Sequence, residues 1–320
     1  MTMERMILLP SVAGKSASTK EPYVFECFSG DKVYVSGTPS AARFLLTGKE
    51  SYGKFTILTS VQNPQPGDYA THAIHAYQFI GDHTEIFSII TPAGFEGMFR
   101  GLGEPYTGPM WPDADLGRPT EKLNSGVANV MTEFDVISVP SHKLVEPQPW
   151  SGSESQLPGS QKPYFLRNCT GPSAVLGGTV VRPCVTGAES GNTYSLATLG
   201  GSDQFETQVL SGGIHFPDVD HCFYVSNGYL EVTVSEPDSS RIGPDEVAWL
   251  SAGTHFNIEP ASSYFKVFMY SQRGGLYDLL YAAGKDKPHA GLNCMIPDSS
   301  SPFERKKLFE YKSQFKYDLI

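Results

Sequence analysis

Short apolar runs separated by turn residues are the feature that most limits how this sequence can fold. Runs of five to seven residues, rich in Val, Phe, Tyr and Thr, recur along the chain between Gly, Pro, Asn and Ser. Such runs are typical of β-strands joined by tight turns. Helical spacing of apolar residues occurs in three short segments, Gly94–Leu102, Asn124–Phe134 and Gly275–Ala283. The sequence therefore predicts an all-β fold with a few short helices.

The strand-like runs fall into two halves. The segment 140–162 between them contains four prolines among Ser, Gly and Gln, which is typical of an interdomain linker. A chain of 320 residues is long enough for two domains. We therefore expect an N-terminal domain over 1–139, a linker over 140–162, a C-terminal domain over 163–290 and a polar, solvated tail over 291–320. Small barrels or jelly rolls would close such strands without exposed edges.

Two turn dipeptides predict hairpins. Gly81-Asp82 separates the strand-like runs Ala73–Ile80 and Thr84–Ile90, and Asn227-Gly228 separates Cys222–Ser226 from Tyr229–Val234. Both dipeptides favour the two-residue turns that join antiparallel neighbours.

Charge and composition exclude several kinds of partner. The chain has 24 basic and 34 acidic side chains, a net charge of −10, which disfavours binding to nucleic acid or an anionic membrane. No run approaches the ~20 apolar residues that cross a bilayer. The first 20 residues lack a secretory signal pattern, and the five cysteines form no CxxC pair, which predicts reduced thiols. The expected location is the cytoplasm.

Motifs in both halves resemble a known family. In the second half, Cys222–Gly228 (CFYVSNG) and Gly243–Phe256 (GPDEVAWLSAGTHF) resemble the two cupin motifs. In the first half, Pro66-Gly67-Asp68, Ile74–Phe79 (IHAYQF) and Thr91–Glu96 (TPAGFE) are similar in order to the N-terminal cupin of fungal quercetin 2,3-dioxygenases. The resemblance runs from about residue 23 to 284. It implies two cupin domains, each a jelly-roll β-barrel.

The first half departs from the family pattern. The resemblance implies a His-x-His and a following Glu between the strand at Phe55–Val61 and the Gly67-Asp68 pair. Residues 62–66 are all that separates these elements here, and they contain neither His nor Glu. We therefore expect the first barrel to be truncated.

The resemblance also implies a mononuclear metal site with imidazole and carboxylate ligands, which suits Fe or Cu. His75 stands where the family's last His ligand stands. In the second half, His221 occupies the position of the signature Glu, His215 precedes it by six residues, and His255 lies one residue short of the motif His. The candidate metal ligands are thus His75, His215, His221 and His255, with Asp218 and Asp220 nearby. The alternatives for the second half are a polar-lined pocket or a sealed structural barrel, because a one-residue slip turns a strand side chain to the other face.

The resemblance implies a metal-dependent dioxygenase, an oxidoreductase that uses O2 on an aromatic or polyketide-type small molecule in fungal secondary metabolism. Two alternatives stay open. One is a metal-free cupin isomerase or cyclase that uses the barrel cavity as a shaped container. The other is a non-catalytic cupin that binds a small molecule. The sequence leaves the oligomeric state, including a homodimer, open.

Overall fold

The computed structural model describes residues 22–26, 29–35, 40–62, 66–70, 74–78, 84–112, 121–137, 148–205, 209, 211–235, 238–284 and 303–320. The chain divides into two compact units. The C-terminal unit consists of residues 149–320 together with strand β1 (Tyr23–Phe25), and the N-terminal unit lies within residues 28–148.

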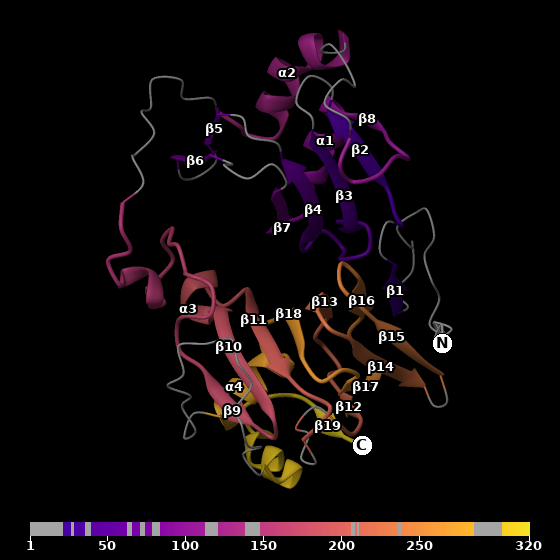
Figure 1. Ribbon diagram of the computed structural model, residues 1–320, viewed down its shortest axis with the longest axis vertical. Coiled ribbons are helices and arrows are strands. Elements are labelled where there is room, and N and C mark those ends of the chain that lie inside the picture. Colours follow the sequence, from indigo (N-terminus) through magenta and orange to yellow (C-terminus); the bar gives the residue numbers. More distant parts are fainter. Residues whose placement is uncertain are drawn as a thin grey trace. The chain divides into compact units, whose positions relative to one another are not determined.

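Two antiparallel sheets build the C-terminal unit (Figure 1). The larger sheet has the order β1, β16 (Val247–Leu250), β13 (His221–Asn227), β18 (Phe265–Gln272), β11 (Tyr194–Gly201), β10 (Thr179–Val185) and β9 (Ala174–Leu176). The smaller sheet has the order β15 (Asp238–Ile242), β14 (Leu230–Ser235), β17 (His255–Pro260), β12 (Ile214–His215) and β19 (Asp318–Leu319). Alternate residues of both sheets enter one apolar cluster, so the two sheets form a jelly-roll sandwich.

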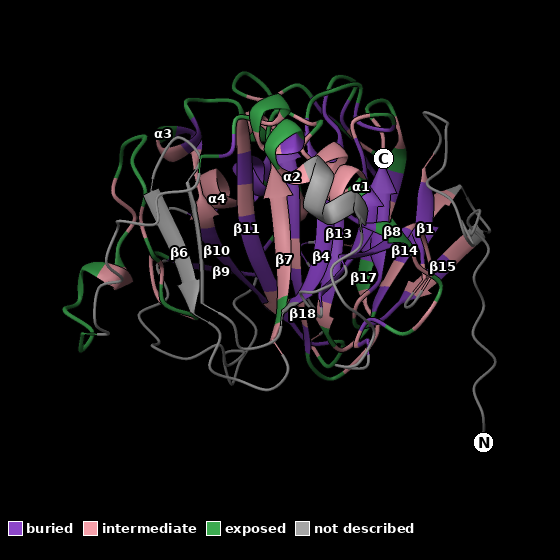
Figure 2. Cartoon of the chain, turned by 90° about the horizontal axis from the view of Figure 1, so that it is seen from above, coloured by how far each residue is buried: buried purple, intermediate pink, exposed green. Residues whose placement is uncertain are grey.

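Alternation along the strands places the core between these sheets. On β13, Phe223 and Val225 belong to the shared cluster, and on β17 Phe256 and Ile258 do so, while Asn257 between them is only half-buried. This period of two is the geometry of a strand with one buried face. The strands of the larger sheet are mostly buried in Figure 2.

The turn at Asn227-Gly228 does not make a hairpin, so that prediction was wrong. Strand β13 pairs with β16 and β18, whereas β14 pairs with β15 and β17. The chain therefore crosses from one sheet to the other at this turn. Gly228 has φ +67°, and a Cβ there would lie 2.0 Å from the Tyr264 carbonyl oxygen, so a side chain would not fit. The dipeptide signals a sharp turn but not which strands pair.

Helix α4 (Leu276–Ala283) lies against β10, β11 and β18. Leu276, Leu279 and Leu280 join the same apolar cluster as the strands. The helix α3 (Gly187–Ser190) begins with a capping box. The side chains of Thr186 and Glu189 each accept a hydrogen bond from the backbone amide of the other residue. Helix α4 matches the helix predicted at Gly275–Ala283, whereas the short α3 was not predicted.

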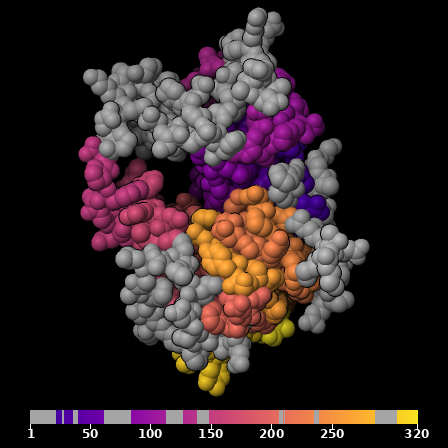
Figure 3. Space-filling model, viewed as in Figure 1, coloured from indigo at the N-terminus to yellow at the C-terminus, as the bar shows by residue number. Residues whose placement is uncertain are grey.

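The C-terminal segment is packed rather than solvated, contrary to expectation. The 3₁₀ helix η2 (Arg305–Tyr311) contacts α4, and Phe303, Leu308 and Tyr317 are buried in the cluster. The Arg305 guanidinium donates to the carbonyls of Gly212 and Gly213 at 2.7 and 2.6 Å. The outer side of this segment is at the surface, where its yellow atoms are visible in Figure 3. The many charged residues of the segment belong to this outer side. The three buried residues lie far apart among them in the sequence.

The N-terminal unit contains a sheet of order β7 (Thr84–Ile90), β4 (Thr56–Gln62), β3 (Ser40–Leu46), β2 (Lys32–Val35) and β8 (Glu104–Pro105). A separate pair, β5 (Pro66–Ala70) and β6 (Ile74–Gln78), and the helices α1 (Glu96–Leu102) and α2 (Glu121–Glu133) complete its described elements. Within the described residues, this unit has the five-stranded sheet and the two-stranded β5–β6 sheet, and the truncation of the first barrel stays a prediction from the sequence.

The expected hairpin at Gly81-Asp82 is also absent from the described pairing. Strand β6 pairs with β5, whereas β7 pairs with β4 over seven residue pairs from Thr56↔Ile90 to Gln62↔Thr84. The longer ladder gives β7 more hydrogen bonds and more cross-strand contacts than the five-residue β6 can offer. Residues 79–83, which join the two strands, lie outside the described part of the chain.

Two expectations about the chain as a whole can be compared with the structure. Cys184 and Cys222 are free thiols, but Cys169 is disulfide-bonded, so the prediction of reduced cysteines was wrong for Cys169. None of the helices in the described residues has the length and apolar character to cross a membrane.

The packed C-terminal segment can be tested with two adjacent substitutions. Leu308 is 1% exposed in the core, whereas Phe309 is 52% exposed. We expect Leu308→Ala to lower the free energy of unfolding by about 2–5 kcal/mol, because it leaves a cavity between η2 and α4. We expect Phe309→Ala to change it by less than about 0.5 kcal/mol. Urea denaturation followed by circular dichroism measures both, and equal effects would contradict the packing described here.

Candidate functional site

The interior of the C-terminal sandwich is where the cupin resemblance places a metal, and His221 points into it. This residue lies on β13 and is 1% exposed. Its ring centroid lies 4.8 Å from Phe216 and 5.4 Å from Phe256, which come from the side of the smaller sheet. Tyr317 closes the same space, with its ring 5.9 Å from that of Phe216. The position expected for an ion is therefore filled by packed aromatic rings.

Both nitrogens of the His221 ring are occupied by the protein backbone. Nε2 accepts a hydrogen bond from the Leu276 amide at 3.0 Å, and the ring also hydrogen-bonds the backbone of Val219. Helix α4 has no side-chain cap of its own at Gly275, so His221 satisfies one of its free amides from a distant strand. A Cβ on Gly275 would lie 2.8 Å from Nε2, which explains a glycine at this contact. His221 is a capping residue here, with no lone pair left for a metal.

Burial also keeps His221 uncharged. The apolar surroundings lower the pKa of its imidazole from 6.5 to about 3, and the hydrogen bond with Val219 opposes this only in part. A neutral ring is required for Nε2 to accept from Leu276. The geometry and the pKa direction therefore agree.

His215 and His255 lie on the opposite face of the smaller sheet from the core. They are direct cross-strand partners on β12 and β17, and their rings stack with centroids 4.2 Å apart and planes 4° from parallel. Their neighbours Ile214, Phe216 and Phe256 are buried, so alternation turns the two imidazoles outward. His215 Nδ1 lies 3.8 Å from Asp318 Oδ2 on β19.

The nearby carboxylates have structural partners. Asp220 is buried and its Oδ1 accepts from the Ala252 amide at 2.8 Å, while the exposed Asp218 pairs with Lys316 at 2.9 Å. The structure therefore brings His215 and His255 together but places His221 on another sheet with other partners. In the part of the chain that the structure describes, no group of three or more His, Cys, Asp or Glu side chains could hold a metal ion.

His75 lies in the N-terminal unit. It falls on β6, opposite Tyr69 of β5, and its side chain lies outside the described residues. The ligand set proposed from the sequence thus does not converge among the described side chains. The donors of the C-terminal barrel do not fit the metal that the family resemblance implies, and no chemical step is derived through one there.

The buried neutral state of His221 predicts a pH dependence of stability. Its pKa is lower in the folded than in the unfolded chain, so the unfolded state binds more protons between about pH 6.5 and 3. The free energy of unfolding should therefore fall as the pH drops through this window, by up to about 1.4 kcal/mol per pH unit from this group. His221→Gln should be less stable at pH 7 and flatter below pH 6.5, since glutamine does not titrate.

Urea denaturation of both proteins from pH 4.5 to 7.5 measures this slope. His255→Gln is the matched control, because His255 is exposed and should leave the slope unchanged. A wild-type slope that persists in His221→Gln would show that other groups cause it.

The chain is similar in sequence to known enzymes. No family model matches the chain. A curated quercetin 2,3-dioxygenase from Aspergillus japonicus is 26% identical over 242 residues, which cover 69% of each chain. A second quercetin 2,3-dioxygenase, from Bacillus subtilis, is 34% identical over 65 residues, or 19% of each chain.

Solved cupin structures also match, at low similarity. The cupin domain of Schizosaccharomyces pombe Cnp3 is 12% identical, with a TM-score of 0.24 over 30% of this chain and 62% of that one. Ectoine synthase from P. lautus is 11% identical, with a TM-score of 0.28 over 40% and 86%. The fold assignment does not depend on these matches but on the strand topology. The two sheets of the C-terminal unit form a jelly roll, and over 242 residues the chain is similar to the Aspergillus quercetin 2,3-dioxygenase.

Proposed function

We propose that this chain is a quercetinase-like oxidoreductase that acts on an aromatic or polyketide-type small molecule with O2 as co-substrate. The similarity to a quercetin 2,3-dioxygenase over 242 residues carries the proposal. A place in fungal secondary metabolism and a cytoplasmic location belong to it.

The geometry of the C-terminal barrel restricts where such a reaction takes place. Its interior is filled by Phe216, His221 and Phe256, and the His221 ring nitrogens already have partners. In our proposal the reacting centre therefore belongs to the N-terminal unit, and His75 on β6 is the residue there that binds the Fe or Cu. The C-terminal barrel then serves as a structural support.

A metal-free function is the second candidate. The absence of a three-donor group among the described side chains favours an isomerase or cyclase, or a non-catalytic binding protein. Proximity and orientation in a cavity can accelerate such reactions without an ion.

Metal content and O2 uptake of the purified full chain separate these candidates. In the dioxygenase, each turnover adds both atoms of O2 to one substrate, so O2 uptake should match loss of quercetin. We expect bound Fe or Cu, and we expect His75→Ala to lower both metal content and activity by at least tenfold. His221→Gln should leave the metal content unchanged, because its ring is not a ligand. Turnover that survives exhaustive chelation would support the metal-free enzyme, and a chain without metal or turnover would leave the binding protein.

A further inference from the structure

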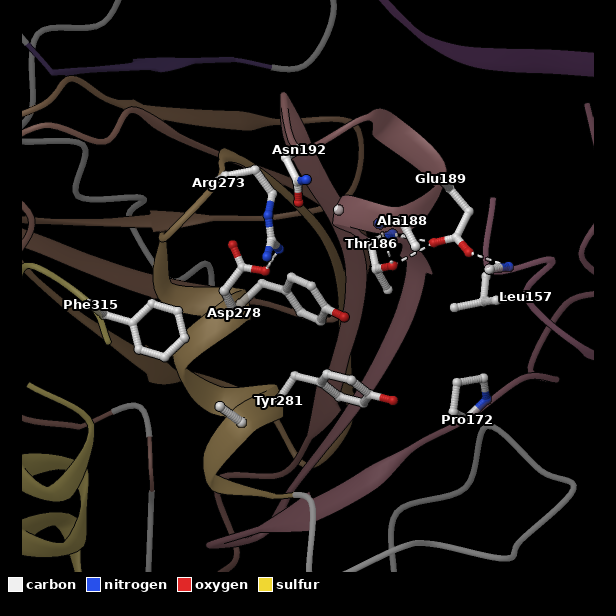
Figure 4. Close-up of a pocket in the computed structure, with 14 residues that line it drawn as sticks. Leu157, Pro172, Thr186, Ala188, Glu189, Asn192, Arg273, Asp278, Tyr281 and Phe315 are labelled. Carbon is white, nitrogen blue, oxygen red and sulfur yellow. Dashed lines mark hydrogen bonds and ion pairs between the residues drawn. The ribbon is translucent and has the colours of Figure 1, made fainter. Parts of the chain in front are cut away.

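A pocket of about 500 Å³ lies in the C-terminal unit, and its lining does not include Phe216, His221 or Phe256. It forms where α3 and α4 meet the segment around Leu157 and Pro172, as Figure 4 shows. Pockets of about 300–1,000 Å³ suit drug-sized ligands. Gly187 at the start of α3 helps to keep the contacts there close, since a Cβ would lie 2.4 Å from Asn192 Oδ1 and 2.8 Å from Arg273 Nε.

One wall of the pocket is aromatic. Tyr277 and Tyr281 stand one turn apart on α4, and their rings stack with centroids 5.7 Å apart and planes 22° from parallel. Figure 4 shows Tyr281 reaching toward the side formed by Leu157 and Pro172. Phe315 adds a further apolar surface. A flat aromatic ligand would find both ring faces and aliphatic contacts here.

The hydroxyl of Tyr277 is a polar group in the pocket lining that needs a hydrogen-bond partner. Tyr277 is 1% exposed, and its Oη has no hydrogen-bond partner among the described residues. An unpaired buried hydroxyl is costly, and native proteins rarely leave one without a reason. Burial also raises the pKa of this phenol, so it stays protonated and can both donate and accept.

The charged groups around the pocket already have hydrogen-bond or ion-pair partners within the protein. Arg273 pairs with Asp278, whose other oxygen accepts from the Gly274 amide at 2.7 Å. Glu189 accepts from the amides of Thr186 and Gly159 at 2.9 and 2.8 Å. A charged ligand would therefore have to break existing pairs. An uncharged ligand with hydroxyl or carbonyl groups would not.

We propose that this pocket binds an uncharged, hydroxylated aromatic molecule, with its ring against Tyr281 and a polar atom on Tyr277 Oη. None of the four candidate histidines lines this site. It goes beyond the proposed function and does not require that function to be correct.

Calorimetric titration of the full chain with quercetin, under argon so that no O2 is consumed, tests the site. Tyr277→Phe removes one hydroxyl, and we expect about tenfold weaker binding with no loss of thermal stability, since the hydroxyl has no hydrogen-bond partner among the described residues. Tyr229→Phe is the matched control on a tyrosine that is 44% exposed, and it should bind as the wild type does. Weaker binding without lower stability separates a ligand contact from a structural role.

A second variant fills the pocket without touching the core. Ala188 is exposed on α3 and lines the pocket, so Ala188→Trp should abolish measurable binding. Ala252→Trp, on an exposed turn, should not. The proposal is overturned if wild-type chain does not bind quercetin at 1 mM, or if Tyr277→Phe and Ala188→Trp both bind it normally. Binding that these variants weaken, in a chain that consumes no O2, would refute the proposed oxidation but not this site.

Discussion

The hydrogen bond from the Leu276 amide to His221 Nε2 is the contact that ties the C-terminal unit together. It links the first amide of α4 to the middle of the larger sheet, inside an apolar layer where neither group could reach water. An unpaired amide or imidazole there would cost far more than the hydrogen bond gains. The aromatic rings of Phe216, Phe256 and Tyr317 pack around this contact and exclude solvent. This bond and the burial of Leu276, Leu279 and Leu280 in the core together hold α4, which lines the pocket.

The same contact argues against a metal ion bound to His221. An imidazole can bind a metal only through a free lone pair, and a site needs several such donors in one place. Here one nitrogen caps a helix and the other side of the ring bonds to Val219. Opening a metal site would require the helix to lose its cap and the aromatic rings to move apart, each at a cost of order 1–3 kcal/mol or more.

The sequence predicts where strands and helices form better than it predicts which strands pair. Strand-length runs and most of the short helices can be read from composition and spacing. Local turns cannot show that β13 and β14 belong to different sheets, because Asn227-Gly228 has the same signature in a hairpin and in a crossing. The packed C-terminal segment is missed because its buried residues, Phe303, Leu308 and Tyr317, are too far apart to form a periodic pattern. Its contacts are all long-range.

The candidate site shows the same limit at the level of single residues. Four histidines close to motif positions are a reasonable ligand set, but a strand reverses its facing at every residue. His255, one residue short of the motif position, faces outward with His215, while His221 faces inward to a helix amide. Tyr277 and Tyr281, by contrast, are four residues apart on a helix and necessarily share a face. That spacing was a usable signal for the pocket. This face of α4 lines the pocket beside α3, whereas Phe216, His221 and Phe256 fill the space between the two sheets.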